Sequence, residues 1–447
     1  MTEHDKTAPR FTVGGPGAVF TLVVVTLLYV VNYMDRMVLS ATLPLIKADL
    51  MLTDAQCGWL GTIYFIVVAL LTIPAAILCD RWSRKKSLAI MALLWTVSTF
   101  LTGMGNRFAP LFAARGGVGV GEAGFAPGGI AFVSGSFKEE SRARVMGVFN
   151  LGQPLGSILG IVIAGVVAQA NLWGMGWRSP FFLFAVPGVL LGILVLFTRD
   201  YPTTPITVRS PGGGQIGVMR GLLVILKTPT LLLTSLGVGA LSFVGGAVGH
   251  WLPTYFVRTR HIDVAKASYL MGGIILVACA GPVLGGILAD KWKRKKKNAR
   301  PLTAAVISLL LGVFLYIGFS VDIAGVFSAS YPIFMFAGIL MFAYTAPAYA
   351  VTQDLVPRSM RSISMGLLVL ITYGTLGAYS PVVVGWLSDL MGSAGEPNLT
   401  AAFLFVPPVA FLGSFLFFMA ARFHDRDVAR ISSGIRDDGD VGDTDTR

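Results

Sequence analysis

GWLGTIYFIVVALLTIPAAILCDRWSRKKS (Gly58–Ser87) and GGIILVACAGPVLGGILADKWKRKKK (Gly272–Lys297) are the two stretches of sequence that decide the fold. Each is a mostly apolar run that ends in an acid, a base, a tryptophan and a cluster of Lys and Arg. The two acids, Asp80 and Asp290, lie nearly half the chain apart. The repeat indicates one membrane unit that is present twice, an arrangement typical of secondary transporters, in which two helix bundles move about a site between them.

The composition also indicates a protein that lies in a membrane. Of its 447 residues, 54% are apolar and 13% are charged, and the mean hydropathy is +0.73. Soluble domains carry about 25% charged residues, so this chain has too little polar surface to cover a globule in water. The net charge of +12 is concentrated in short Lys- and Arg-rich segments between apolar runs. This placement is typical of cytoplasmic loops, so we expect a lipid bilayer and no nucleic acid as a partner.

Twelve apolar runs are each long enough to cross a bilayer, which takes about 20 residues. They cover approximately 18–46, 56–79, 87–105, 108–136, 142–170, 179–198, 229–257, 266–289, 301–320, 330–356, 361–391 and 400–421. An even number places both termini on one side, and the basic loops after the second, fourth, eighth and tenth runs make that side cytoplasmic. We expect an all-α membrane protein with twelve transmembrane helices in two pseudo-symmetric six-helix halves.

These runs divide the chain into five parts. We expect a cytoplasmic N-terminal segment, a first bundle, a cytoplasmic linker rich in Pro and Gly, a second bundle and a disordered cytoplasmic tail, at 1–17, 18–198, 199–228, 229–421 and 422–447. The tail mixes Arg and Asp without apolar periodicity, which is the reason to expect disorder there. The expected location is the bacterial inner membrane, as a monomer.

Four charged residues lie inside the apolar runs: Asp35, Arg36, Arg115 and Glu122. A charge at the centre of a membrane helix costs about 2.5–3.5 kcal/mol on insertion scales, so such residues usually face a cavity or a partner and often serve function. At 1.5 Å per residue, Asp35 and Arg115 lie roughly 16 and 10 Å from the outer ends of their helices, so the two could meet. A purely structural ion pair between them remains an alternative.

The chemistry of these residues suggests different roles. Burial disfavours a charged carboxylate and a nearby arginine favours it, so Asp35 and Glu122 are candidates for proton coupling. Arg115 offers a permanent charge and a planar fork of donors, which suits an anionic substrate. Arg36 either lines the same cavity or pairs elsewhere. Further candidates for substrate contact, for which structural roles are equally plausible, are Asn32, Tyr33 and Tyr373. His250 is another, although a lone histidine in an apolar run is more often a hydrogen-bonded structural residue.

The sequence gives no indication of an enzyme. It contains no nucleophile–base or paired-carboxylate motif and no nucleotide-binding P-loop, and its three cysteines lack metal-ligand spacing. The G-x-G-x-x-G match at Gly119–Gly124 lies within an apolar run, where glycines let helices approach closely, so it does not predict a dinucleotide site. We expect no cofactor and no metal.

Several motifs resemble those of the major facilitator superfamily. Ala76–Lys85 is similar to the signature between the second and third helices, Gly286–Lys295 is a second copy, and Arg115–Gly121 is similar to the fourth-helix signature. Within that superfamily the chain most resembles the spinster-like transporters, through the NYMDR motif at Asn32–Arg36, RGGVGVGEA at Arg115–Ala123, the DRWSRKK loop and Gly176–Arg178.

The resemblance implies roles for particular residues. It makes Asp35 and Glu122 positions of proton or substrate coupling and Arg115 the arginine that binds substrate. It also implies gate residues that close the cytoplasmic side by pairing with the opposite half, namely Asp80, Arg81, Arg84, Arg144 and Asp290. Spinster-like proteins are associated with export of sphingosine-1-phosphate and lysophospholipids.

The leading hypothesis is therefore a proton-coupled secondary transporter that works by alternating access on an amphipathic or anionic small molecule or a lysolipid. The alternatives are an organic-anion or drug transporter of the same superfamily, an uncoupled facilitator, and a membrane scaffold or sensor. The intramembrane carboxylates favour coupling over passive transport.

Overall fold

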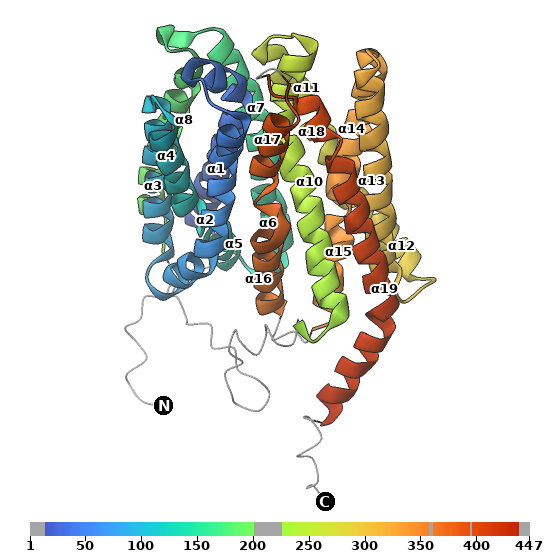
Figure 1. The fold of residues 1–447 in the computed structure, drawn as a ribbon. Coiled ribbons are helices and arrows are strands. Elements are labelled where there is room, and N and C mark those ends of the chain that lie inside the picture. Colours follow the sequence, from blue (N-terminus) through green and yellow to red (C-terminus); the bar gives the residue numbers. More distant parts are fainter. Residues whose placement is uncertain (1–13, 201–225, 357–360, 394–395, 438–447) are drawn as a thin grey trace, which may run out of the picture.

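The computed structural model describes residues 14–200, 226–356, 361–393 and 396–437, and nearly all of these are helical. Most of the expected segments 1–17 and 199–228 lies outside the described residues. The described helices form two bundles side by side, the first half of the chain on the left and the second on the right in Figure 1. Both bundles consist of α-helices, as the apolar runs predict.

The first half consists of helices that run back and forth along one direction. They are α1 (Pro16–Leu50), α2 (Asp54–Arg81), α3 (Arg84–Met104), α4 (Phe108–Glu122), α5 (Phe125–Gly135), α6 (Glu139–Asn150), α7 (Gly152–Gln169) and α8 (Ser179–Leu194), with short 3-10 turns η2 (Leu172–Gly174), η3 (Gly176–Arg178) and η4 (Val195–Phe197).

The second half repeats this plan. It consists of α10 (Pro229–Arg260), α11 (Val264–Ala278), α12 (Gly281–Lys293), α13 (Ala299–Ile323), α14 (Phe327–Ala343), α15 (Thr345–Asp354), α16 (Arg361–Thr372), the π-helical turn η6 (Tyr373–Gly377), α17 (Ser380–Leu390), α18 (Leu399–Phe403) and α19 (Val406–Asp437). Several of the expected spans are thus pairs of helices in line. Prolines at the first turns of α12 and α17 account for two of these joints, since proline lacks the N–H that would continue the helix before it.

One expected span differs from the prediction. Within the described residues, eleven helical segments are long and apolar enough to cross a bilayer, and the run 108–136 is not among them. It divides into α4 and α5, of 15 and 11 residues, at Ala123 and Gly124. The glycines bring this segment close to its neighbours: a Cβ on Gly121 would lie 2.5 Å from the backbone N of Trp95. A residue without a side chain is needed for α4 to approach α3 this closely at Gly121.

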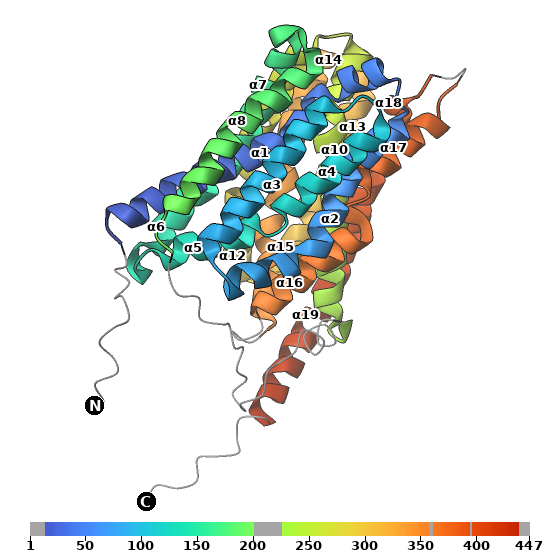
Figure 2. The ribbon, with the colours of Figure 1, turned by 90° about the vertical axis from the view of Figure 1, so that its left-hand side faces the viewer.

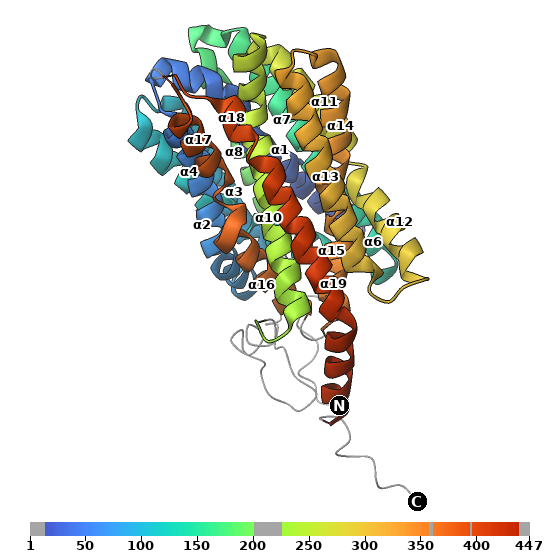
Figure 3. The ribbon, with the colours of Figure 1, turned by 45° about the vertical axis from the view of Figure 1, so that its right-hand side comes forward.

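The expected disorder of 422–447 is also wrong for the part that is described, because α19 continues as a helix to Asp437 (Figure 3). A tertiary contact accounts for the difference. Asp427 is buried, and its Oδ2 accepts hydrogen bonds from the backbone N and the Oγ1 of Thr230, at 2.9 and 2.6 Å. It thereby satisfies a free N–H in the first turn of α10. Residues 438–447 lie outside the described residues.

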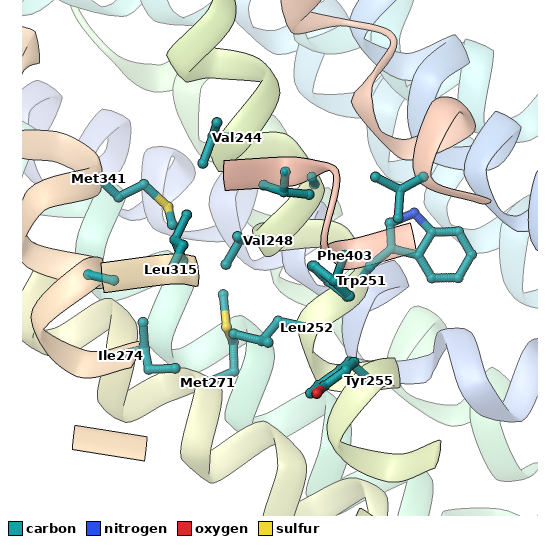
Figure 4. Close-up of a cluster of buried hydrophobic side chains, with 14 of the residues drawn as sticks. Val244, Val248, Trp251, Leu252, Tyr255, Met271, Ile274, Leu315, Met341 and Phe403 are labelled. Carbon is teal, nitrogen blue, oxygen red and sulfur yellow. The ribbon is translucent and has the colours of Figure 1, made fainter. Parts of the chain in front are cut away.

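Helix α10 is the central helix of the second half. Its apolar side chains pack against α11, α13, α14 and α18, and Figure 4 shows this core, with Val244, Val248, Trp251, Leu252, Tyr255, Met271, Ile274, Leu315, Met341 and Phe403. The last turns of α10 are also held by Asp322 of α13, whose buried carboxylate accepts from Tyr255 Oη at 2.6 Å and pairs with Arg260. The end of α10 is therefore fixed within its own half.

The two halves are joined at one end. We call it the contact end; it is where Met51–Thr53 connects α1 to α2, and the opposite end, where α1 begins and α19 finishes, is the terminal end. Among the described residues, the hydrogen bonds between halves run from α1 and α2 to α10 and α17. Helix α2 lies beside α16 and α17 (Figure 2), and α7 lies against α11.

Candidate functional site

The four charged residues singled out in the sequence lie together inside the first bundle. Asp35 and Arg36 come from the middle of α1, and Arg115 and Glu122 come from α4. Asp35, Arg115 and Glu122 are at most 2% exposed, and the Arg36 side chain is 23% exposed. Arg115 and Glu122 are seven residues apart, so they share one face of α4. The structure thus brings all four charges into one cluster, whereas the sequence suggested only that Asp35 and Arg115 could meet.

The ion pair in this cluster is not the one that helix depth suggested. Arg36 Nε donates to Glu122 Oε2 at 2.8 Å, and Tyr64 Oη of α2 donates to the same oxygen at 2.6 Å. Asp35 instead accepts a hydrogen bond from Thr99 Oγ1 of α3, at 3.3 Å from its Oδ2. Successive residues of a helix point about 100° apart, so Asp35 faces α3 while its neighbour Arg36 faces α2 and α4.

Several polar atoms of the cluster have no hydrogen-bond partner among the described residues. They are Asp35 Oδ1, Glu122 Oε1, the Nε and Nη1 of Arg115, and both amide atoms of Asn32. A buried polar group left unpaired costs about 1–3 kcal/mol, and more if it is charged. Arg115 interacts electrostatically with Glu122 and Asp35 but donates to neither, so it can bind an anion without first breaking a hydrogen bond to them.

Aromatic rings separate the two arginines. The guanidinium carbon of Arg36 lies 4.4 Å from the ring centroid of Tyr33 and 5.5 Å from that of Tyr64. Arg115 lies 5.5 Å from the same Tyr64 ring. Contact with an aromatic face stabilises a cation in an apolar site, by about 2 kcal/mol when it is desolvated. Tyr64 thus contacts three members of the cluster.

Two predicted substrate contacts lie at the boundary between the halves. Tyr373 of η6 stacks on Phe65 of α2, with ring centroids 5.7 Å apart and planes at 12°. His250 of α10 is buried, and its Nε2 lies 3.1 Å from the carbonyl O of Cys57 in α2. His250 therefore joins the halves through the backbone of α2. π-Helical turns such as η6 frequently mark functional sites.

The predicted gate residues lie at the terminal end. Asp80, Arg81 and Arg84 lie where α2 passes into α3, but the side chain of Asp80 lies outside the described part of the chain. Arg144 is exposed on α6. Asp290 accepts from Arg300 at 3.2 Å within its own half, and Arg300 also pairs with Asp354. Cross-bundle pairing by these residues remains a prediction.

Sequence reasoning missed Tyr64, Thr99 and Asp54. Tyr64 and Thr99 lie in apolar runs where a hydroxyl residue is common and carries no signal of its own. Asp54 carries no signal either, because it stands at the edge of an apolar run, where an acid cannot be distinguished from an ordinary loop residue. Its position after Thr53, which forms a capping box with Gln56, does predict the start of α2.

Comparison with known proteins places the fold in a family. The sequence model of the Major Facilitator Superfamily matches residues 25–381. An MFS-type efflux pump of Mycolicibacterium smegmatis is 27% identical over 440 residues, covering 96% of this chain and 97% of that protein. The sphingosine-1-phosphate transporter SPNS2 of Xenopus tropicalis is 27% identical over 424 residues, covering 90% of this chain and 81% of that protein.

The solved structures agree on the fold. A bacterial homologue of the human lysosomal transporter Spinster, in an inward-facing and unoccupied conformation, matches with a TM-score of 0.77 at 21% identity, over 94% of this chain and 98% of that chain. The relatives are transporters rather than enzymes, and the bacterial ones indicate a multi-pass protein of the inner membrane. Since the family model covers most of the chain, this protein belongs to the major facilitator superfamily, and it is similar to the spinster proteins within it.

Proposed function

We propose that the protein is a proton-coupled secondary transporter of an anionic amphipathic molecule, such as a lysolipid, and that it acts as a monomer by alternating access. In this proposal α4 and α5 together make the twelfth crossing, and both termini are cytoplasmic. The basic residues of the loops at the terminal end support that orientation. The contact end is then periplasmic, and the structure is the conformation that opens to the cytoplasm.

The observation that carries the proposal is the state of Arg115. Its guanidinium is buried beside two carboxyl groups, yet two of its nitrogens have no hydrogen-bond partner among the described residues. An arginine fork binds a carboxylate or phosphate through two parallel hydrogen bonds. An anionic headgroup is the ligand that would satisfy these donors and the charge at once.

The two carboxyl groups have different environments, which suggests different roles. Glu122 accepts hydrogen bonds from two donors on one oxygen, Arg36 and Tyr64. Asp35 receives one hydrogen bond, from the hydroxyl of Thr99. We propose that Asp35 carries the proton while Arg115 holds the substrate. Once the proton and the substrate have both left, Arg115 turns to the ionised carboxylate of Asp35. This exchange couples the two movements because the anion and the ionised carboxylate compete for one arginine.

A binding experiment tests the role of Arg115. Sphingosine-1-phosphate and a lysophospholipid would be titrated into the purified wild type, Arg115→Lys and Arg115→Ala. Arg115→Lys keeps the charge but loses the fork, so we expect weaker binding, and weaker still for Arg115→Ala. Arg178→Lys is the matched control, because Arg178 pairs with Asp49 on the surface at the contact end. Equal affinity in all variants would contradict the proposal.

A drug exporter is the second candidate, supported by the likeness to the Mycolicibacterium smegmatis efflux pump over nearly its whole length. Its ligands would be neutral or cationic. The buried carboxyls Asp35 and Glu122, rather than Arg115, would then bind a cationic ligand. The same titration separates the candidates if a lipophilic cation is included. Tight binding of the cation alone, lost in Glu122→Gln, would favour the exporter. Transport without any response to a pH gradient would favour an uncoupled facilitator.

A further inference from the structure

A groove lies at the surface of the second half, between α17 and α19. Helix α17 packs against α2 and α18, α19 packs against α13, and both pack against α10. Helix α10 lies between the two and forms the floor of the groove, as Figure 3 shows. The contact end of the groove is closed by α18, which packs against α17 and leads into α19. The volume of the groove is about 350 Å³.

The groove begins where the last membrane segment is interrupted, at Leu404 and Phe405. These two residues join α18 to α19, and Pro407 and Pro408 follow in the first turn of α19, where a missing N–H breaks no helical hydrogen bond. The backbone N–H groups of Leu404 and Phe405 donate to carbonyl groups of α18. The joint therefore widens the space beside α17 without leaving these two donors unpaired.

The lining of the groove is apolar. The described residues that line it are all Phe, Val, Leu or Pro. Phe243 of α10, Val384 of α17 and Val406 of α19 are at most 7% exposed and form its floor, whereas Leu412 of α19 is 44% exposed at its rim. A buried water needs about two to four polar partners, which these side chains do not offer. An empty groove would deprive the lining atoms of contacts on one side, so an apolar group is the occupant that fits.

The groove has the length and position expected for a lipid tail. On α19 it extends from Val406 to Leu412, which is roughly 9 Å at about 1.5 Å per residue. One leaflet of the hydrocarbon core is about 15 Å thick, half of the bilayer's roughly 30 Å, so the groove covers more than half of one leaflet. On α17 it reaches Leu387, one turn before the helix ends at Leu390. It therefore lies in the leaflet at the contact end.

The surroundings of the groove offer no positive charge for a lipid headgroup. Residues 362–421, which include α17, α18 and the first turns of α19, contain no Lys or Arg. The two arginines at the end of α10, Arg258 and Arg260, pair with Asp54 and Asp322. Recognition at this site consequently depends on the hydrocarbon chain and not on the charge of the headgroup.

We propose that this groove binds one acyl chain of a bilayer phospholipid from the leaflet at the contact end. The chain completes the packing of α17, which lies against α2 of the first half on one side and borders the groove on another. The site is separate from the charged cluster, because it is lined by α10, α17 and α19 whereas Arg115 and its neighbours belong to the first half. The inference therefore depends neither on the identity of the transported molecule nor on proton coupling.

Photochemical labelling of the whole protein tests the site. Phosphatidylethanolamine with a benzophenone on one acyl chain would be added to the detergent-solubilised protein, and labelled residues would be identified by mass spectrometry. The reference is Leu190 of α8, which is 58% exposed, more than Leu412. Both leucines lie 11–13 residues from the start of their membrane segments at the contact end, so their depth is similar.

The two kinds of lipid contact predict opposite results. Lipid that only surrounds the protein labels Leu190 more than Leu412, because labelling follows exposure, and labelling rises steadily with added lipid. We expect instead that Leu412 is labelled at least threefold more than Leu190 and that its labelling saturates. Labelling of Leu412 that is no stronger than that of Leu190, without saturation, would overturn the proposal.

Variants that fill the groove provide a second test. Val409→Phe adds bulk from the α19 wall and Val383→Phe from the α17 wall, and both positions are only partly buried. Each should lower the labelling of Leu412 at least threefold, and one folded variant is enough for the comparison. Val97→Phe, the same change at an exposed position of α3, is the matched control and should leave the labelling unchanged. Undiminished labelling of Leu412 in a folded groove-filling variant would also refute the site.

The source of the chain is tested by changing the lipid. Phosphatidylglycerol with the same chain should label Leu412 to within twofold, since no basic residue selects a headgroup. If a benzophenone-bearing lysophospholipid labels Leu412 and the phospholipids do not, the groove belongs to the path of the transported molecule and the proposal is wrong. Arg115→Ala, which removes the proposed substrate site, should leave labelling by the phospholipid unchanged. The groove and the proposed function can therefore fail independently.

Discussion

Tyr64→Phe tests whether the arrangement of the charged cluster determines ligand affinity. The change removes one hydroxyl and keeps the ring, so the contacts of that ring with Arg36 and Arg115 persist. Glu122 Oε2 then loses its 2.6 Å hydrogen bond and keeps Arg36 alone. A hydrogen bond to a charged group contributes about 1.5–3 kcal/mol. Its loss lowers, by up to this amount, the free energy needed for the Glu122 carboxylate to turn toward the unpaired nitrogens of Arg115.

The expected effect is a loss of affinity for an anion, because Arg115 must first be released from Glu122. At 1.4 kcal/mol per factor of ten, the full energy corresponds to about 10- to 150-fold, which is the upper limit of the loss. Titration of sphingosine-1-phosphate into detergent-solubilised wild type and Tyr64→Phe measures it. Tyr316→Phe is the control, since Tyr316 is exposed on α13, away from the cluster. Folded Tyr64→Phe that binds as tightly as the wild type, or an equal loss in Tyr316→Phe, would refute the reasoning.

Three further predictions concern stability and gating. Asp427→Ala should lower the free energy of unfolding by about 1–3 kcal/mol, because the buried N–H and hydroxyl of Thr230 lose their acceptor. Asp425→Ala, at an exposed position of the same helix, should leave it unchanged, and equal thermal stability of the two variants would count against a cap. Asp322→Ala should cost about 3–5 kcal/mol by leaving Arg260 partly buried without its carboxylate, and a loss below 1 kcal/mol in the same assay would show that the pair is dispensable. The family pattern places the Asp80 carboxylate against a helix N-terminus of the other half in the conformation closed to the cytoplasm, a contact that contributes about 0.3–1 kcal/mol. Asp80→Asn should therefore shift the population about two- to fivefold toward the conformation that opens to the cytoplasm, and unchanged cysteine labelling from the cytoplasmic side would remove this role.

Much of the fold could be predicted from the sequence because lipid imposes simple requirements. Continuous apolar runs of the right length have to be helices, since their backbone polar groups cannot be satisfied otherwise. The repeated acid–base–tryptophan motifs at Asp80 and Asp290 indicated two related halves. The close approach of α4 to α3 at Gly121 was not predictable, because it depends on contacts between helices and not on the length of an apolar run. The helical tail was missed because a tertiary contact, Asp427 with Thr230, holds it.

The members of the site were predictable but their partners were not. Asp35, Arg36, Arg115 and Glu122 stand out because each is a charge in an apolar run. Depth along a helix can be counted from the sequence, whereas the rotation of each helix about its axis depends on contacts between helices. That rotation decides that Arg36, rather than Arg115, pairs with a carboxylate in this conformation.

The contacts between the halves at the contact end show the same limitation in another form. Asp54 is the best satisfied carboxylate that joins the halves, yet it stands at the edge of an apolar run, where acids are ordinary. Its partners come from positions about 200 and 330 residues later in the chain. Only the fold brings them together, so no local pattern could have identified them.

Proton-driven accumulation by Asp35→Asn tests the central claim most directly. Proteoliposomes would be loaded to impose a pH gradient, and uptake of labelled sphingosine-1-phosphate or lysophospholipid would be followed in the wild type and in Asp35→Asn. Asp49→Asn is the matched control, since it makes the same change at the exposed end of the same helix. We predict that Asp35→Asn loses gradient-driven accumulation but retains exchange of substrate across the membrane without a gradient, while the control behaves as the wild type. Accumulation by Asp35→Asn against a substrate gradient would contradict the assignment of proton coupling to Asp35.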